Sequence, residues 1–464
     1  MSKRPIYMRN KNRTGLLFLV LLLFLGGIVY NYNRTFSYEY FVDNSELKGR
    51  TFKGNVTEII DEKTNIKAYF IAEKNAPLIA LSFIFAKSGF AYEDGSLQGI
   101  SNLVAATLDA GAGKRDAEAL KKDMDINGIK ISFNTDKDAF NGIITFPKDG
   151  LSKAVEILRS VLMTPKFENK YVETAKAQIL KSLEAEKENP ANQLKLAVNE
   201  FVYDNHNYSR NMLGTIDTIS KIKGSDLKNF VKANLVKDGL YIGVAGDLTD
   251  DEVKKTINDI FGDLPQHSNN KNLDNVVIDW DKNDLQIDRV TGQNIATYIM
   301  TGTCRKCGDF YPLYIANYLF GGAGLNSRLN QQIREKEGLT YGAYSSMILS
   351  DKSNLVMAGF SATKDNFAKA EKMFFEELNE AAQKGFSSEE LKNAKNYLTA
   401  SYNLRFASTI GIAEMLAYMQ KYDLGKDFLQ KRNEYVMNVT LEQLNAVAEK
   451  YFGNRVLKAS IGSF

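Results

Sequence analysis

The pattern of hydrophobic and polar positions along the chain predicts two similar halves. Residues 225–235 carry apolar side chains at helical spacing and lead to the apolar run 240–246, as expected for an amphipathic helix followed by a buried strand. The same order returns in 441–452 and 457–462. A repeat of roughly 200 residues is too long for a solenoid and indicates a duplicated domain. Earlier helical segments also have counterparts, 154–158 with 370–374 and 174–180 with 393–398.

Alternating strand patterns open the first half. They fall at 67–71 and 78–85 and, after an intervening helix, at 130–134 and 141–146. Such an order predicts a sheet backed by helices on one face. We therefore expect an α+β fold, with two homologous α/β-sandwich domains in tandem after one N-terminal transmembrane helix.

The expected transmembrane helix comes from the uncharged run 15–30, which is rich in Leu and Phe and follows a basic segment. Sixteen helical residues cover roughly 24 Å, less than the roughly 30 Å of a hydrocarbon core, so length allows either an anchor or a cleavable signal. The weak small-residue pattern at 25–27 favours an uncleaved signal anchor. The preceding basic residues predict a cytoplasmic N-terminus. They are Lys3, Arg4, Arg9, Lys11 and Arg13.

Composition narrows the function classes. The net charge of +3 comes from 59 basic and 56 acidic residues spread along the chain, so we expect no nucleic-acid partner. A polar segment separates the two halves as a linker. The predicted segments are the cytoplasmic basic segment 1–14, the signal anchor 15–32, the juxtamembrane segment 33–52, the N-terminal domain 53–264, the linker 265–275 and the C-terminal domain 276–464.

The two cysteines, Cys304 and Cys307, are three residues apart. In an exported domain this spacing favours a local disulfide that closes a loop, whereas a redox role lacks its usual sequence context. A zinc site would need two further ligands, and the chain has only the scattered His206 and His267 besides carboxylates.

Residues 325–341 are the strongest candidate for chemistry. The pattern predicts a helix that is entered from a glycine-rich turn, ends at Gly338, and is followed by a strand from about Leu339. Arg334 and Tyr341 would then face one point, where they can hold a peptide carbonyl and stabilise an oxyanion. Ordinary helix-dipole complementation and strand packing remain the alternative. The glycines of the turn are Gly321, Gly322 and Gly324.

With these segments, the chain from about residue 53 onward resembles the pitrilysin and insulinase metalloproteases, in the branch of mitochondrial processing peptidase and its bacterial relatives. That family binds zinc through an inverted His-x-x-Glu-His motif on a helix, with the Glu as general base and a distant Glu as third ligand. The matching stretch here is 98–108. Asn102, Ala105 and Ala106 stand at the motif positions, and Ser182 stands at the distant one. The resemblance therefore implies a chain that is inactive alone and holds no metal.

The second half departs less from the family. The resemblance implies that Arg334 and Tyr341 bind and orient substrate over a zinc ion held elsewhere, while the loop 321–324 lets the substrate backbone approach. It implies a heterodimer with a zinc-bearing homologous subunit, and a peptide substrate. The basic flank and the signal anchor predict attachment to the bacterial inner membrane with both domains in the periplasm. The alternative is a structural or peptide-binding pseudoenzyme, like respiratory-complex core subunits. No Ser-His or Cys-His arrangement supports an autonomous hydrolase.

The run 78–85 resembles the first-domain strand that borders the substrate chamber, where an extended peptide adds to a sheet edge. Its nearly continuous apolar character equally predicts a buried core strand.

Overall fold

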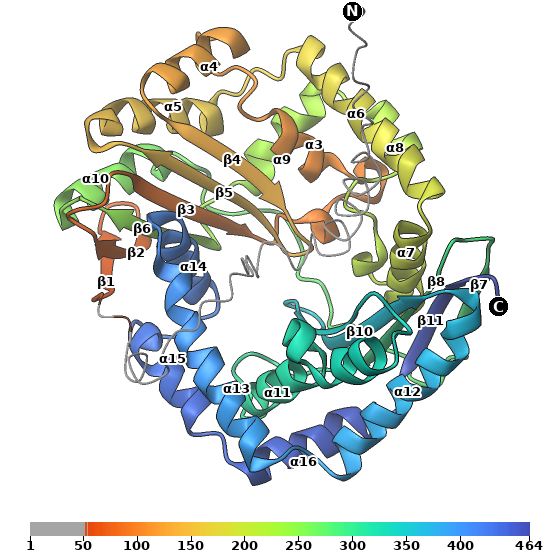
Figure 1. The fold of residues 1–464 in the computed structure, drawn as a ribbon. Coiled ribbons are helices and arrows are strands. Elements are labelled where there is room, and N and C mark those ends of the chain that lie inside the picture. Colours follow the sequence, from red (N-terminus) through yellow and green to blue (C-terminus); the bar gives the residue numbers. More distant parts are fainter. Residues whose placement is uncertain (1–51, 53) are drawn as a thin grey trace, which may run out of the picture. The chain divides into compact units, whose positions relative to one another are not determined.

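The strands of the first half form one mixed sheet in the computed structural model, which describes residues 52 and 54–464 (Figure 1). The strand order is β1-β2-β6-β3-β5-β4, with β2 and β6 parallel and the other neighbours antiparallel. Its strands are β1 (Thr57–Asp61), β2 (Ile66–Ala72), β3 (Ile79–Ala86), β4 (Lys130–Thr135), β5 (Ala139–Phe146) and β6 (Leu240–Gly246).

Helices of the first half cover one face of this sheet and build its main core. Phe83, Phe85 and Phe261 pack edge to face there, and all three side chains are buried. All helices of this half except α7 lie on that side: α3 (Ile100–Thr107), α4 (Ala117–Ile126), α5 (Leu151–Met163), α6 (Asn169–Glu188), α8 (Ile216–Lys221), α9 (Gly224–Asn234) and α10 (Asp250–Phe261). Helix α7 (Pro190–Tyr203) packs elsewhere.

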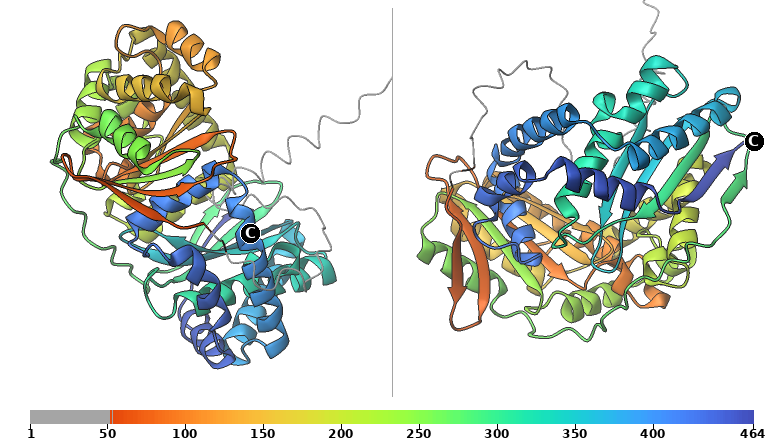
Figure 2. Two further views of the ribbon diagram at one scale, coloured as in Figure 1. Left: turned by 90° about the vertical axis from the view of Figure 1, so that its left-hand side faces the viewer. Right: turned by 90° about the horizontal axis from the view of Figure 1, so that it is seen from below.

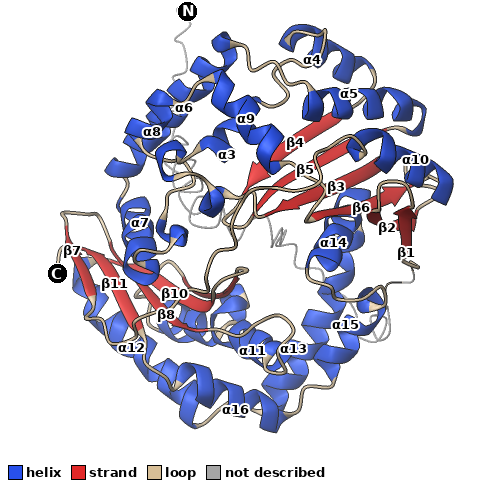
Figure 3. Cartoon of the chain, turned by 180° about the vertical axis from the view of Figure 1, so that it is seen from behind, coloured by secondary structure: helices blue, strands red, loops and turns tan. Residues whose placement is uncertain are grey.

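The second half repeats the plan with the strand order β7-β11-β8-β10-β9 (Figure 3). At its centre, Tyr298 stacks on both Phe360 and Phe374, whose own rings are tilted relative to each other. The strands are β7 (Leu285–Asp288), β8 (Asn294–Thr301), β9 (Ala343–Leu349), β10 (Asn354–Ala362) and β11 (Leu457–Gly462). The α-helices are α11 (Phe310–Asn317), α12 (Lys364–Gln383), α13 (Ser388–Ala400), α14 (Thr409–Lys421), α15 (Phe428–Met437) and α16 (Leu441–Phe452).

The two halves exchange helices. Helix α14 of the second half packs on β6 and β3 of the first, burying Ile412, Ala413 and Leu416 against the sheet (Figure 2). In return, α7 of the first half packs on β11 and β8 of the second. The helices of each half back one face of their own sheet, as predicted. The prediction did not include the opposite face, on part of which one helix of the other half packs.

The close packing of α14 depends on Gly243 in the middle of β6. A Cβ atom there would collide with the carbonyl oxygen of Ala413 and lie 2.5 Å from the amide nitrogen of Ala417. The backbone amide of Ile242 also donates a hydrogen bond to the Gln420 side-chain oxygen at 2.6 Å. The helix backbone therefore rests almost directly on the strand backbone.

The repeated helix-and-strand pattern is confirmed, since α9 leads to β6 and α16 leads to β11. Of the two interpretations of 78–85, the core strand is confirmed, because β3 is hydrogen-bonded on both sides, to β5 and β6. The proposed peptide-accepting edge at that strand is wrong for the same reason. Sheet edges lie instead at β1, β4, β7 and β9.

No helix among the described residues is both long and apolar enough to cross a membrane. The predicted anchor 15–32 lies outside the described residues, as do its basic flank 1–14 and nearly all of 33–52.

Candidate functional site

Helices α3 and α6 carry the four residues that the sequence pattern matches to the positions of zinc ligands and general base. Asn102 and Ala105 are half-buried on α3, and Ala106 is exposed. Helix α6 packs against α3 and carries Ser182, whose hydroxyl donates a hydrogen bond to the carbonyl of Gln178 at 3.0 Å. An amide, a hydroxyl and two methyl groups offer neither imidazole nor carboxylate, so these residues do not fit a zinc ion.

The two histidines lie apart from this helix pair. His206 Nε2 is 3.0 Å from the carbonyl oxygen of Asp274, and His267 Nδ1 is 2.5 Å from the Asp238 carboxylate. Within residues 54–464, no three His, Cys, Asp or Glu side chains gather as a metal site would require.

Arg334 and Tyr341 stand at the two ends of the connection into β9. Arg334 lies in the π-helical segment Asn330–Lys336, with its side chain 39% exposed and its Nε atom 3.6 Å from Glu335. Gly338, at φ +63°, donates a hydrogen bond to the Arg334 carbonyl at 2.9 Å and ends the helix. Tyr341 follows and is 73% exposed. Both side chains are therefore accessible to an external ligand.

The local structure around this pair differs from the predicted helix and strand. A 3-10 turn, Gly324–Asn326, precedes the π-helical segment, and β9 begins at Ala343 rather than near Leu339. The Asn330 side-chain oxygen accepts a hydrogen bond from the amide of Ala343 at 3.0 Å, and the Thr340 hydroxyl donates to the carbonyl of Ser361 at 2.6 Å. Side chains thus hold 339–342 as a connection before strand pairing starts.

The three candidate glycines have different surroundings. Gly321 is buried in the segment Tyr318–Gly322, where a Cβ atom would lie 2.5 Å from the amide nitrogen of Ser345 on β9. A Cβ atom at Gly322 would lie 3.1 Å from the Asn317 carbonyl oxygen. Gly324 has φ +59° and open space around it. Gly321 therefore lets its helix pack on β9, while Gly324 leaves room on the surface beside 325–341.

A buried carboxylate, which sequence reasoning missed, holds the start of α3. Glu93 accepts hydrogen bonds from the amides of Gly99 and Ser101, both at 2.7 Å. Burial raises the pKa of Glu93 to about 7, although the bonds from Ser101 and Gly99 and the charge of Arg210 oppose the shift. An acidic residue six positions before a helix-entry glycine was the available sequence signal.

The raised pKa of Glu93 predicts a pH dependence of stability. Because the folded chain binds this proton up to about pH 7 and the unfolded chain only up to about 4.5, the contribution is fully present below 4.5 and is lost as pH rises through 7. A shift of this size corresponds to about 3 kcal/mol. In urea unfolding, we expect Glu93→Gln to remove the part of the change in unfolding free energy with pH that comes from this carboxyl group. Equal slopes for the two proteins between these pH values would contradict the assignment.

A second missed group is a polar cluster between the halves, which we call the closure cluster: Asp138, Tyr208, Asp351 and Lys421. Asp138 and Tyr208 are buried, whereas the side chain of Asp351 is 27% exposed. Asp138 accepts a hydrogen bond from the amide of Asp351, 213 residues away, at 2.9 Å, and a second from the Tyr208 hydroxyl. The Tyr208 oxygen accepts from the amide of Lys352 at 3.0 Å. Lys421 Nζ lies 3.4 Å from the Asp351 carboxylate, with its side chain only 9% exposed. The cluster therefore connects the turn between β4 and β5, the turn between β9 and β10, and the end of α14.

Electrostatics in the closure cluster follow from its burial. Desolvation, then the charge of Asp351, raises the pKa of Asp138 to about 6. Desolvation alone would lower the pKa of Lys421, but Tyr422 and the carboxylates of Asp136, Asp351 and Asp138 outweigh it and raise that pKa. Lys421 therefore stays charged and compensates the acidic groups around it.

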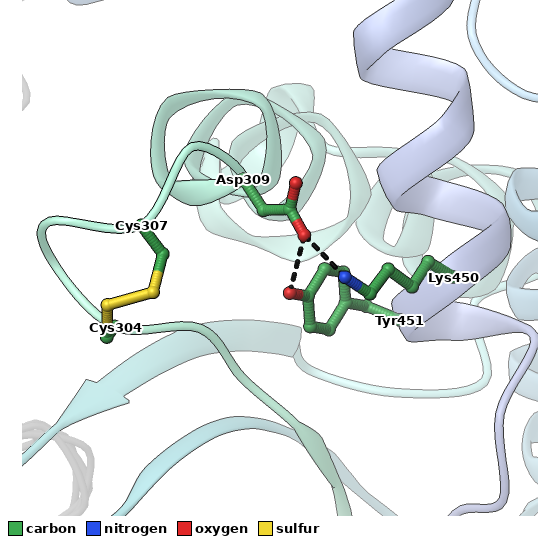
Figure 4. The surroundings of a disulfide bond; sticks show 5 residues. All are labelled: Cys304, Cys307, Asp309, Lys450 and Tyr451. Carbon is green, nitrogen blue, oxygen red and sulfur yellow. Dashed lines mark hydrogen bonds and ion pairs between the residues drawn. A yellow bond between two sulfur atoms is a disulfide. The ribbon is translucent and has the colours of Figure 1, made fainter.

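Cys304 and Cys307 are joined by a disulfide in the loop between β8 and α11 (Figure 4). Directly after it, the Asp309 carboxylate accepts hydrogen bonds from Lys450 Nζ at 2.7 Å and from the Tyr451 hydroxyl at 2.9 Å. These contacts attach the end of the loop to α16.

The duplicated fold and the altered α3–α6 pair define a protein built like a two-domain peptidase but lacking its metal ligands. The profile described as insulinase (peptidase family M16) matches residues 71–216, and the profile described as peptidase M16 inactive domain matches 221–398. The chain belongs to the M16 peptidase family.

Individual relatives cover most of the chain. The non-peptidase homolog YmxG of Helicobacter pylori is 25% identical over 83% of this chain and 89% of its own length. The uncharacterized zinc protease YmxG of Bacillus subtilis is 21% identical over 80% of this chain and 89% of its own. The crystal structure of a peptidase M16 inactive domain from Pseudomonas fluorescens shares the fold, with a TM-score of 0.81 at 23% identity over 88% of this chain and 98% of that chain.

Proposed function

We propose that this chain is the non-catalytic subunit of a heteromeric zinc peptidase, in which Arg334 and Tyr341 bind and orient peptide at a zinc site supplied by a homologous partner. The observation that carries the proposal is the contrast between the two halves. The positions for metal ligands hold Asn102, Ala105, Ala106 and Ser182, while Arg334 and Tyr341 remain in place and exposed.

Catalysis by this chain alone is disfavoured by chemistry. Hydrolysis in this family needs a metal-activated water and a carboxylate that takes its proton, and an alanine side chain does neither. The partner would therefore supply zinc, its ligands and the general base. The guanidinium and the phenol would donate hydrogen bonds to the peptide carbonyl that is attacked.

The surroundings of Arg334 and Tyr341 support peptide binding. Strand β9 pairs with β10 on one side and ends the order of its sheet on the other. Strand β9 begins two residues after Tyr341, and because the amide and carbonyl of its first residue, Ala343, are bonded to the Asn330 side chain, the edge open to a peptide begins beyond Ala343. An extended peptide can add there through main-chain hydrogen bonds while its carbonyl reaches the Arg334 and Tyr341 side chains. Half-exposed Tyr344, on the same strand, adds an apolar surface for a peptide side chain.

The cellular setting belongs to the same proposal. The basic segment followed by the apolar run 15–32 supports a signal anchor in the bacterial inner membrane, with the two domains in the periplasm. Such an anchor would keep the chain and its partner subunit at the membrane surface, where exported peptides pass.

The pair makes a direct prediction. In the complex of this chain with its zinc-bearing partner, Arg334→Ala and Tyr341→Phe should each raise KM or lower kcat for peptide cleavage about tenfold, the usual effect of losing one hydrogen bond to a charged group. Lys336→Ala is the matched control, because it removes an exposed positive charge from the same π-helical segment. Unchanged cleavage by both variants would leave the pair without a substrate role.

The second candidate function is a structural or peptide-binding pseudoenzyme without a catalytic complex. The H. pylori relative, described as a non-peptidase homolog, favours it. Purification of the full chain with its bound partners separates the two. Zinc-dependent cleavage in the purified assembly supports the first function, and a stable assembly that contains no zinc subunit supports the second.

A further inference from the structure

The disulfide loop is fixed at both ends on the core of the second half. It begins just after β8, and Asp309 at its far end is bound to Lys450 and Tyr451 of α16 (Figure 4). A hydrogen bond from the amide of Cys307 to the carbonyl of Cys304, at 3.1 Å, closes the same turn as the disulfide. The two residues between the cysteines are therefore held in one orientation.

Those two residues, Arg305 and Lys306, contact the C-terminal end of α14 and the residues just after it. The Arg305 guanidinium lies 4.8 Å from the ring centre of Tyr418 on α14 and 4.7 Å from that of Phe310. Lys306 Nζ is 2.7 Å from the carboxylate of Asp423, two residues past the helix end. One cation–π contact and one exposed ion pair are individually weak, so their value depends on a loop that already holds both side chains in place.

The end of α14 that contacts the disulfide loop also contacts the first half. Gln420 accepts the hydrogen bond from Ile242 of β6, and Lys421 lies in the closure cluster beside Asp351. The contacts of the disulfide loop with α14 and the contacts of α14 with the first half therefore lie within a few residues of one another.

We propose that Cys304–Cys307 is a thiol–disulfide exchange site for a dithiol reductant, and that its oxidised form locks the end of α14 onto the first half. Cys307 is exposed, which gives an external thiolate access to its sulfur. The flanking positive charges of Arg305 and Lys306 favour the thiolates that exchange releases.

The exchange balances as a two-electron reduction. One thiolate of the reductant attacks Cys307 Sγ, forms a mixed disulfide and expels Cys304 as a thiolate. The second thiolate of the reductant then attacks the reductant sulfur that is bonded to Cys307. Cys307 leaves as a thiolate, and the reductant becomes a disulfide. Two protons complete the two thiols. The opened loop then no longer holds Arg305 and Lys306 against α14.

Hydrogen exchange of the full chain, oxidised or treated with dithiothreitol, tests the proposal. We expect reduction to speed amide exchange about tenfold in α14 and in the β6 segment that contains Ile242, consistent with the loss of two weak contacts. The contact of α7 with β11 is the matched internal control, because it has the same architecture without a disulfide and should not change.

Two results would overturn the proposal. In one, thiol alkylation after dithiothreitol shows that the folded chain keeps its disulfide. In the other, the bond is reduced but exchange in α14 and β6 is unchanged, or rises equally at α7 and β11. Cys304→Ser with Cys307→Ser should reproduce the reduced pattern without reductant. If that variant does not fold, reoxidation of the reduced wild-type chain decides, because protection of α14 must then return.

Discussion

Replacing Gly243 with alanine is expected to cost the chain about 3 kcal/mol or more of folding free energy, at the upper end for overpacking, because the clash is with backbone. The added Cβ atom would meet the carbonyl oxygen of Ala413, the amide nitrogen of Ala417 and, at 2.8 Å, the Cβ atom of Leu416. None of these atoms can rotate away as the end of a flexible side chain can. Helix α14 must therefore lift from β6.

Urea unfolding and hydrogen exchange check this expectation together. Gly292→Ala is the matched control, since a Cβ atom at Gly292 meets nothing within 4 Å and its φ is not in the left-handed region. The control should be neutral or slightly stabilising. In Gly243→Ala, the hydrogen bond from Ile242 to Gln420 should open with the helix, so fast exchange should appear in β6. A variant as stable as Gly292→Ala would refute the close-packing argument.

The second large effect is expected from Lys421→Met, which should destabilise the chain by about 3 kcal/mol. This is the lower end of the range for breaking a buried ion pair from one side, because the side chain of Asp351 is 27% exposed. Methionine fills much of the same volume, so the loss comes from charge. It leaves the carboxylates of Asp138 and Asp351 at the junction of the halves without their buried cation.

The pH dependence of this variant provides an independent check. Lys421 lowers the pKa of Asp138, so its removal should raise that pKa further above the usual value. The folded variant then binds the Asp138 proton to higher pH, and its stability falls as pH rises through that raised pKa. The deficit should therefore be larger at pH 8 than at pH 5.

Lys121→Met serves as the control for charge removal. Lys121 forms an ion pair with Asp125 at 2.5 Å on the surface of α4, with its side chain 67% exposed. Its loss should change stability by less than about 0.5 kcal/mol. An equal effect of the two lysine substitutions would show that the closure cluster does not hold the halves together.

Much of the architecture was predictable because it follows from local periodicity. The helix-and-strand endings at 225–246 and 441–462 repeat, and both become helix and buried strand as expected. The candidate site was partly predictable. Arg334 and Tyr341 stand out through their spacing from Gly338. The late start of β9, however, goes with side-chain hydrogen bonds between Asn330 and Ala343 and between Thr340 and Ser361, which the sequence pattern does not show.

The helix exchange was not predictable, since α14 and α7 look like ordinary amphipathic helices of their own halves. Their covering role depends on which sheet lies beside them. Gly243 likewise looks like a neutral residue in an apolar strand, and its importance appears only when the backbone of α14 is placed against it. A one-sided sheet was the simplest local solution, but burying the second face gives each half a larger apolar core.

The sequence by itself determined the duplicated α+β plan, the scarcity of histidines for a zinc site, and the presence of an arginine and a tyrosine beside a strand. These are properties of residue identity and of short periodic patterns. The tertiary structure decided that β3 is a core strand, that α14 and α7 interlock the halves, and that Asp138, Tyr208, Asp351 and Lys421 form one cluster. Such features depend on contacts between residues that lie far apart in the sequence, such as Asp138 and Asp351, which are separated by 213 positions. The energies of these contacts arise only when folding brings the groups together away from water.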